Sequence, residues 1–282
     1  MDGYVIRLHD EPSQIDASAW NSLLDAGDDA TPFMRHEYLA ALHESGSATA
    51  ATGWQPLFAT VQRDDELLAA APLYLKTHSY GEYVFDWAWA DAYQRHGLAY
   101  YPKLLGAVPF TPVPGARLMA RDDTARKALL AHVLDWCRQH NLSSLHLLFV
   151  PDYELAACTA AGLMERHTVQ FHWKNVAPYK DFEEFLAALT QEKRKKIRQE
   201  RRKVRDANIT FRRLAGTDIR EADWDFFTAC YRKTYREHRS TPYLNRAFFG
   251  LLGERMADHL MLVIAERGGQ PIASALNLLG GG

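Results

Sequence analysis

The chain has 282 residues, of which 47% are hydrophobic, 24% charged and 12% aromatic. This composition is typical of a globular protein with one large core or two medium ones, and it excludes disordered, collagen-like and fibrous chains. Three cysteines, Cys137, Cys158 and Cys230, are widely spaced and form no CxxC pair. Disulfides and a thiolate zinc site are therefore disfavoured, and we expect buried, unreactive thiols.

Neither a membrane span nor an export signal is expected. The longest nearly uninterrupted apolar run, residues 67–75, is interrupted by a proline and is far shorter than the roughly 20 residues of a spanning helix. The first eleven residues carry charge and lack the apolar core of a signal peptide. The sequence therefore predicts a cytoplasmic protein.

Positive charge is concentrated in one segment. The whole chain has 33 Lys and Arg against 35 Asp and Glu, a formal net charge of −2. Residues 192–205 alone hold nine Lys or Arg and two Glu, so this segment carries +7 and the remainder −9. An extended basic coat for nucleic acid is excluded, and any anion must bind locally.

The residue pattern in the first half of the chain predicts strands, helices and one hairpin. Apolar periodicity and cap residues predict a strand at 4–8, helices at 18–26 and 35–44, and a hairpin of strands 58–63 and 67–76 joined at Asp64-Asp65. Tyr83, Phe85, Trp87 and Trp89 then alternate, which predicts a strand with four aromatics on one face. Residues 101–115, rich in proline and glycine, are expected to form a loop.

The second half continues with a similar mixture of elements. The predicted order is helix 123–140, strand 145–150, helix 152–162, strand 165–173, one long basic amphipathic helix 181–205, strand 209–214, helices 221–237 and 246–257, and strands 260–266 and 271–279. The predicted class is α/β, of the α+β type with mixed sheets.

An internal repeat suggests two domains of one kind. At an offset of 204 residues, segment 58–71 aligns with 262–275, and both read as strand, two-residue turn, strand after two helices. We expect domains at 1–175 and 176–282, the second beginning with the basic amphipathic helix. Because residues 77–174 follow the first hairpin while the chain stops soon after the second, the second copy is expected to be incomplete.

Several strings resemble one bacterial family. They are HSYGEYVFDWAWADAY at 78–93, GLAYYPKLL at 97–105, VPFTPV at 108–113, QFHW at 170–173, the basic run that starts at Lys193, and TPYLNRAFF at 241–249. In this order they resemble the bacterial predicted N-acyltransferases of peptidoglycan biosynthesis or recognition, which are relatives of the FemAB aminoacyltransferases. The resemblance implies tandem GNAT-like acyltransferase domains, and family members continue beyond the last hairpin of this chain.

The phosphate loop of ordinary GNAT acetyltransferases, Gln/Arg-x-x-Gly-x-Gly/Ala, follows neither hairpin. We therefore expect no tightly bound cofactor, with acyl-CoA as a possible co-substrate.

The 12 histidines show no chelating spacing, because His167 and His172 would point to opposite faces of a strand, so no metal site is expected. The sequence contains no Gly-x-Ser-x-Gly elbow, so a nucleophilic triad is not expected.

Segment 78–96 holds the candidate catalytic residues. Amide formation needs a deprotonated amine and a site that holds both reactants in attack geometry. Asp86 is the candidate base, with Glu82 and His78 close to it at the opposite face or the ends of the aromatic strand. Tyr80, Tyr83, Trp87, Trp89 and Lys103 are candidate substrate-binding residues. The alternative is an aromatic core strand with solvated acids.

Further candidate substrate-binding residues lie in the second half. Arg194, Arg198 and Arg201 share one helix face, which suits a phosphate clamp, a nucleic-acid contact or a solvated surface. His172 and Trp173 would line a substrate groove or belong to the core. Tyr235, Arg236 and Tyr243 would line a groove between the domains or pack the two domains together.

The functional prediction is an N-acyltransferase. It would form an amide between an activated acyl donor, acyl-CoA in preference to aminoacyl-tRNA, and an amine-bearing small molecule or cell-envelope precursor. Two alternatives stay open: a non-catalytic protein that binds an anionic envelope precursor, and an RNA-binding protein that uses the helix at 192–205. The sequence does not define the oligomeric state.

Overall fold

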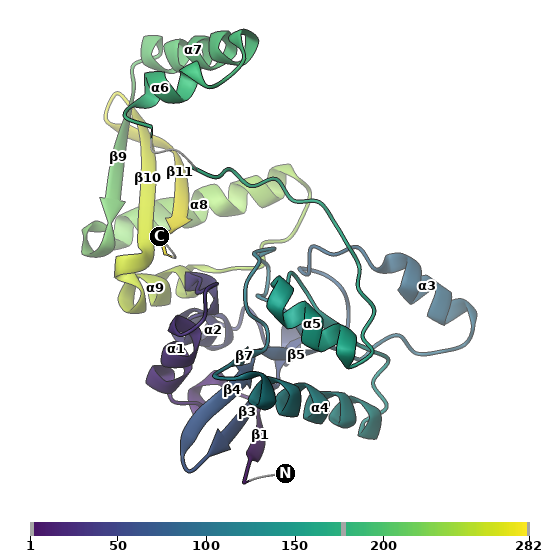
Figure 1. Ribbon diagram of the computed structural model, residues 1–282. Coiled ribbons are helices and arrows are strands. Elements are labelled where there is room, and N and C mark those ends of the chain that lie inside the picture. Colours follow the sequence, from purple (N-terminus) through teal and green to yellow (C-terminus); the bar gives the residue numbers. More distant parts are fainter. Residues whose placement is uncertain (1–2, 176–178, 281–282) are drawn as a thin grey trace.

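The computed structural model describes residues 3–175 and 179–280 (Figure 1). The first half contains β1 (Val5–His9), α1 (Ala17–Asp25), α2 (His36–Glu44), β2 (Trp54–Pro56), β3 (Phe58–Arg63), β4 (Glu66–Ala71), β5 (Leu73–Lys76), α3 (Trp87–Arg95), β6 (Lys103–Gly106), β7 (Met119–Ala120), α4 (Asp123–Gln139), β8 (Leu145–Leu147) and α5 (Asp152–Ala160). The second half contains α6 (Phe182–Ala187), α7 (Gln191–Asp206), β9 (Ile209–Ala215), α8 (Glu221–Glu237), α9 (Arg246–Arg255), β10 (Leu260–Arg267) and β11 (Gln270–Leu278).

The strands form three sheets, with the orders β1-β3-β4-β7, β2-β5-β6-β8 and β11-β10-β9. Strands β6 and β8 pair in parallel, while β3–β4, β5–β6 and β10–β11 are antiparallel. Helices pack against these sheets, so the predicted mixed α/β class is confirmed. Among the described residues, no helix combines the length and the apolar character needed to cross a bilayer.

One hydrophobic core runs through both halves of the chain. Trp20, Tyr38 and Phe58 belong to the same buried cluster as Trp224 and Phe248. The Tyr38 and Phe248 rings meet edge to face with centroids 5.5 Å apart, and α9 lies beside α2 (Figure 1). The expected boundary between residues 175 and 176 borders positions 176–178, which lie outside the described residues, so it stays a prediction.

The repeat predicted from the sequence has a counterpart in geometry. Both hairpins turn through two residues with positive φ, Asp64-Asp65 and Gly268-Gly269. Their registers shift between Val61 and Gln62 in one and between Ala265 and Glu266 in the other, positions that are again 204 residues apart. In each copy, the first strand of the hairpin also pairs with the strand that precedes the two helices: β3 pairs with β1, and β10 pairs with β9. These common features support the expected duplication.

The predicted strand at 67–76 is two strands. Pro72 separates β4 from β5, and the two belong to different sheets. Proline has no N–H to donate to a strand ladder, so the pairing is interrupted where it lies. Pro72 therefore directs the chain from the first sheet into the second.

The expected loop at 101–115 was wrong in part, because it contains the buried strand β6. This strand is short, follows Pro102 and ends at Gly106, so the proline and glycine content of the segment favoured a loop. Gly106 fits here because a Cβ on it would lie only 2.6 Å from Leu147 Cδ2 on the neighbouring strand.

The aromatic strand predicted at 83–89 is also wrong. Residues 83–86 have no regular structure, Tyr83 has φ of 58°, and α3 begins at Trp87. Phe85 is 81% exposed and Trp87 45%, so the alternative of an aromatic core strand fails as well. Alternation over only four positions does not outweigh the alanines that follow, which favour a helix.

Two further predictions are corrected. The expected strand at 165–173 has no regular structure, and β8 covers only three residues of the strand expected at 145–150. The single long helix expected at 181–205 is two helices, α6 and α7, because Thr190 starts a new helix and its side chain accepts a hydrogen bond from Lys193 N. Of the cysteines, Cys137 and Cys158 are buried as expected, while Cys230 is half-buried.

Candidate active site

Two lysines face each other at the centre of the second sheet. The antiparallel register of β5 and β6 places Lys76 opposite Lys103, and both side chains are fully buried. Like charges directly opposite on neighbouring strands are unfavourable, and a buried ammonium needs a charged partner. The sequence around them must therefore supply negative charge.

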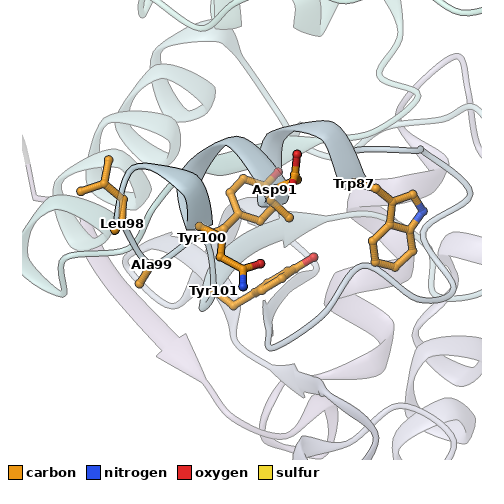
Figure 2. A pocket seen from close by; sticks show the side chains of 9 residues that line it. Trp87, Asp91, Leu98, Ala99, Tyr100 and Tyr101 are labelled. Atoms are coloured by element: carbon orange, nitrogen blue, oxygen red, sulfur yellow. The ribbon is translucent and has the colours of Figure 1, made fainter.

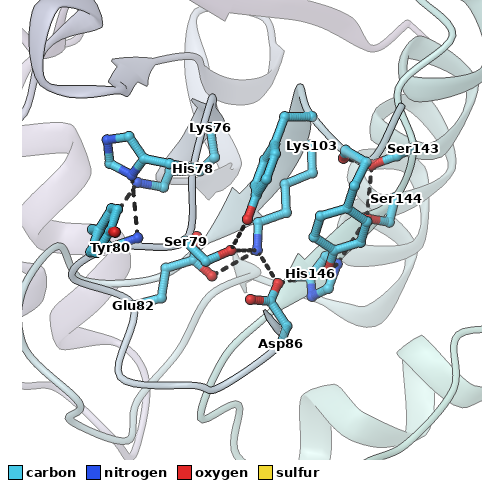
Figure 3. A network of polar contacts seen from close by, with 12 residues as sticks. Lys76, His78, Ser79, Tyr80, Glu82, Asp86, Lys103, Ser143, Ser144 and His146 are labelled. Carbon is cyan, nitrogen blue, oxygen red and sulfur yellow. Dashed lines mark hydrogen bonds and ion pairs between the residues drawn. The ribbon is translucent and has the colours of Figure 1, made fainter. Parts of the chain in front are cut away.

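Glu82 and Asp86 supply that charge (Figure 3). Lys103 Nζ donates to Glu82 Oε2 at 2.8 Å, to Asp86 Oδ2 at 2.5 Å and to Ser79 Oγ at 3.0 Å. Both carboxylates belong to the segment between β5 and α3, and Asp86 is the residue immediately before that helix. The ion pairs thus anchor the start of α3 to strand β6.

Two tyrosines complete this network. We use the name Lys103 network for the residues Ser79, Glu82, Asp86, Tyr100, Tyr101 and Lys103. The Tyr100 hydroxyl donates to Asp86 Oδ2 at 2.6 Å, and the Tyr101 hydroxyl lies 2.7 Å from Ser79 Oγ. Glu82 Oε1 and Asp86 Oδ1 are buried without a hydrogen-bond partner among the described residues. Buried acceptors without partners are rare in folded proteins, so a polar ligand atom or water is expected there.

The environment of each group changes its acid strength. Burial lowers the pKa of Lys76 to about 7, against the ordinary value of 10.5. Burial likewise raises the pKa of Glu82. For Asp86, burial disfavours the charged carboxylate, but hydrogen bonds from Lys103 and Tyr100 outweigh it and hold the pKa below its ordinary value.

His146 on β8 borders the network. Its Nε2 lies 2.8 Å from Ser144 Oγ and 3.4 Å from the Tyr100 hydroxyl. Burial, reinforced by the Lys103 charge, lowers the pKa of His146 to about 4. The ring is therefore neutral at neutral pH, so one of its nitrogens donates a hydrogen bond and the other accepts one.

A groove of about 610 Å³ lies between α3 and the segment that follows it (Figure 2). Its lining residues are Trp87, Ala90, Asp91, Gln94, Gly97, Leu98, Ala99, Tyr100 and Tyr101. Tyr100 and Tyr101 belong to both the groove and the Lys103 network. Asp91 is the one charged residue in the lining, and its carboxylate pairs with Arg95 at 2.8 Å on the helix surface.

Sequence reasoning named three catalytic candidates, and the structure brings two of them together. Glu82 and Asp86 share Lys103, whereas His78 lies apart: its Nε2 is 3.0 Å from Thr52 O and its Nδ1 accepts from Tyr80 N at 3.2 Å. The Tyr80 ring contacts Trp87, with centroids 5.2 Å apart. Trp89, although 43% exposed, is not in the groove lining.

Lys103 was named as a substrate-binding residue, and the structure places it instead among buried carboxylates. Five members of the site were missed: Lys76, Ser79, Tyr100, Tyr101 and His146. Ser79, Tyr100 and Tyr101 lie inside the distinctive strings at 78–93 and 97–105, and Lys76 lies just before the first of them. His146 is far from both strings, so the sequence around it gave no signal.

The tyrosines of the second half meet the first half at a shared aromatic cluster. Tyr243 stacks on Phe110 with centroids 4.7 Å apart, and Tyr235 meets Tyr243 at 5.9 Å. Burial, followed by the Coulombic effect of Tyr235 and a hydrogen bond with it, raises the pKa of Tyr83 to about 12, so Tyr83 belongs to the same cluster. Arg236 is exposed on α8.

His172 and Trp173 lie in the irregular segment before α6. His172 Nε2 is 3.0 Å from Gln170 Oε1, and the Trp173 ring packs toward Phe185 at 6.1 Å. Neither residue lines the groove beside α3. Among the described residues, no three His, Cys, Asp or Glu side chains group as a metal site would require.

The three arginines proposed as a phosphate clamp instead contact α6. Arg194 Nη1 donates to Ala187 O at 3.1 Å and Leu189 O at 2.7 Å, closing the end of that helix. Arg198 pairs with Glu183 at 2.5 Å, and the Arg201 guanidinium lies 4.0 Å above the Phe182 ring. The remaining cations of α7 are exposed: Lys193, Lys195, Lys196, Arg202, Lys203 and Arg205.

The mixed sheets, the Lys103 network and the adjoining groove define a mixed α/β protein with a polar site beside a surface cavity. The chain belongs to the FemAB-like family, described as peptidoglycan biosynthesis/recognition, whose sequence profile matches residues 11–282. Comparison with curated proteins gave no match.

Among solved structures, the chain is similar to FemX, with 13% identity and a TM-score of 0.45 over 89% of this chain and 56% of FemX. It thus spans little more than half of that protein. The aminoglycoside 6'-N-acetyltransferase AAC(6')-IG from Acinetobacter haemolyticus is 15% identical, with a TM-score of 0.35 over 61% of this chain and 99% of its own. AAC(6')-Iy in complex with CoA is 17% identical, with a TM-score of 0.34 over 61% of this chain and 94% of its own.

Proposed function

We propose that this chain carries the amine-acceptor site of an N-acyltransferase, and that the groove beside α3 holds the acceptor. Family membership supports a transferase role in peptidoglycan biosynthesis. The observation that carries the proposal is the groove lining, which combines the aromatic side chains Trp87, Tyr100 and Tyr101 with one carboxylate, Asp91, and contains no cation.

This lining suits an ammonium group. Aromatic faces attract cations through the ring quadrupole, and a carboxylate adds a charged partner. It does not suit the diphosphate of a nucleotide, because no basic side chain lines it. The acyl donor, for which we propose an acyl thioester ahead of aminoacyl-tRNA, therefore binds outside this groove.

The Lys103 network provides a route for the proton. Amide formation joins the amine nitrogen to the acyl carbon, breaks the bond from that carbon to the leaving sulfur or oxygen, and releases a proton from the ammonium. The Tyr100 hydroxyl already donates to Asp86 Oδ2, so its oxygen accepts a proton as its own passes to the carboxylate. Because hydrogen bonds hold the pKa of Asp86 below its ordinary value, the carboxylate carries this proton only in transit and passes it to solvent or to the leaving group.

The test is release of thiol from acetyl-CoA in the presence of a series of primary amines, with amide formation verified by mass spectrometry. Replacing Asp91→Asn removes the carboxylate that attracts the ammonium, so KM for the amine should rise about fivefold. Replacing Arg95→Gln frees Asp91 from its ion pair, so KM should fall.

The matched control is Asp135→Asn on α4. Asp135 pairs with Arg138 and has the same side-chain exposure, 62%, as Asp91, but it is not in the groove lining. Its KM should equal that of the unmodified chain. Activity that is insensitive to Asp91 and Arg95 would place the acceptor elsewhere, and no transfer from either acetyl-CoA or aminoacyl-tRNA would refute the proposed reaction.

A further inference from the structure

A second pocket, of about 290 Å³, lies between α1, β7 and the first turns of α4 and α5. Its floor is apolar and includes Leu23, Leu24 and Met119, all of which are buried. None of its lining residues belongs to the groove beside α3. The backbone on one side is held in place, because Glu154 accepts hydrogen bonds from Arg117 N at 2.8 Å and Leu118 N at 2.9 Å.

Arg126 supplies a cationic edge to this pocket. The residue is only 9% exposed, and its Nε donates to Leu118 O at 3.2 Å while Nη1 pairs with Asp123. Its Nη2 makes no hydrogen bond to another described residue. The guanidinium carbon also lies 5.3 Å from the centroid of the Tyr153 ring. Because Arg126 lines the pocket and its Nη2 has no hydrogen-bond partner among the described residues, the guanidinium is a donor for an anionic group.

Two carboxylates supply negative charge at the rim of this pocket. Asp28 and Asp29 are exposed lining residues, and neither makes an ion pair with any residue in the described ranges 3–175 and 179–280. Burial raises the pKa of Tyr153 to about 12, and the charges of Glu154, Asp29 and Asp28 add to this effect. The two rim carboxylates line the same pocket as Tyr153, whose hydroxyl makes no hydrogen bond to another described residue.

We propose that this pocket binds a zwitterionic α-amino acid with an aliphatic side chain. The ligand carboxylate pairs with Arg126 and the Tyr153 hydroxyl, its ammonium pairs with Asp28 and Asp29, and its side chain lies on Leu23, Leu24 and Met119. The pocket is large enough for such a ligand and offers both charges together with an apolar floor.

Isothermal titration calorimetry with L-leucine tests the proposal on the whole chain. Leucine should bind more tightly than 4-methylpentanoate, which lacks the ammonium, and than 3-methylbutylamine, which lacks the carboxylate. Glycine, without an apolar side chain, should also bind more weakly. The double replacement Asp28→Asn with Asp29→Asn should raise the Kd for leucine about tenfold, and Tyr153→Phe should raise it severalfold.

The matched control is Asp64→Asn with Asp65→Asn. It removes two exposed carboxylates at the distant β3–β4 turn, where asparagine tolerates the positive φ. Its Kd for leucine should be unchanged. The proposal fails if leucine does not bind, if either single-charge analogue binds as tightly as leucine, or if the Asp28 and Asp29 replacement leaves the Kd unaltered. Acyl transfer is not measured, so the outcome is independent of the groove beside α3.

Discussion

Lys76 and Lys103 lie directly opposite each other on neighbouring strands of one sheet, but their side chains have different partners. Lys103 contacts two carboxylates, whereas the partners of Lys76 Nζ within the described ranges are only the Tyr80 carbonyl at 3.4 Å and the face of the Trp54 ring at 3.6 Å. A backbone carbonyl and a ring quadrupole compensate a buried charge less fully than a carboxylate does. The protonated form of Lys76 is therefore the less stable of the two.

This difference predicts how stability depends on pH. The pKa of Lys76 is about 7 in the folded chain and 10.5 when unperturbed, so between these values the unfolded chain binds more protons. Stability should then rise with pH from about 7 upward, by roughly 1 kcal/mol per pH unit relative to Lys76→Met. Urea unfolding of both proteins at pH 7, 8 and 9 measures it. A constant difference across this range would contradict the assignment, and Lys193→Met on exposed α7 is the control.

At the scale of elements, the basic helix α7 has two different sides. Arg194, Arg198 and Arg201 contact α6, while Lys195, Arg202 and Lys203 are exposed. The local excess of positive charge is thus partly used to hold a helix of only six residues. A helix that short is not stable by itself.

Replacing the first set with alanine should release α6. In the Arg194, Arg198 and Arg201 triple variant, amide hydrogen exchange in residues 182–190 should accelerate at least about tenfold, because the three contacts between α7 and α6 described above are lost. The triple replacement of Lys195, Arg202 and Lys203 removes the same charge and should leave the exchange rates unchanged. Equal acceleration in both variants would mean that net charge, rather than contact, controls α6.

Elements with strong local signals could be predicted from the sequence. Helices α1, α2, α4, α8 and α9 and both hairpins were confirmed, because their periodicity and turn residues act over a few positions. Strand β6 was missed because four residues beside a proline are too few for a pattern, and α3 was missed because alternating aromatics imitate a strand. Tertiary packing decides the local structure of β6, whereas α3, which has no buried residue, follows the helix preference of its alanines.

The candidate site was only partly predictable for the same reason. Glu82, Asp86 and Lys103 could be named from their chemistry, but their pairing could not be predicted. The ion pairs join positions 21 and 17 residues apart. The strand expected at 83–89 would have kept the chain extended, whereas the chain there is irregular and then helical. His146 reaches the network through the parallel pairing of β8 with β6. No short-range pattern in the sequence specifies that pairing.

At the scale of the whole molecule, the two halves share contacts that bind them into one structure. Arg255 pairs with both oxygens of Glu44 at 2.7 Å, and Asn245 Nδ2 donates to Ser45 O at 2.7 Å. Together with the Tyr38 and Phe248 rings, these contacts join α9 to α2 across one continuous core.

We therefore expect cooperative unfolding of the two halves. Phe248→Ala leaves a cavity in the shared core and should lower stability by about 3 to 5 kcal/mol. Scanning calorimetry should show one transition that moves to lower temperature as a unit. If a first-half transition stayed in place while a second moved, the two halves would fold independently. The exposed Phe85→Ala replacement serves as the control, with little change expected.

The facing lysines also restrict how this chain can diverge. Lys76, Lys103, Glu82 and Asp86 form a buried group of two basic and two acidic side chains, in which Lys76 is only partly protonated near pH 7. A single replacement changes the charge that the remaining side chains must compensate in the interior, whereas paired replacement of one acid and one lysine reduces both signs of charge together. Substitutions at these four positions are therefore coupled, and related sequences that depart from this pattern should change at two of them together.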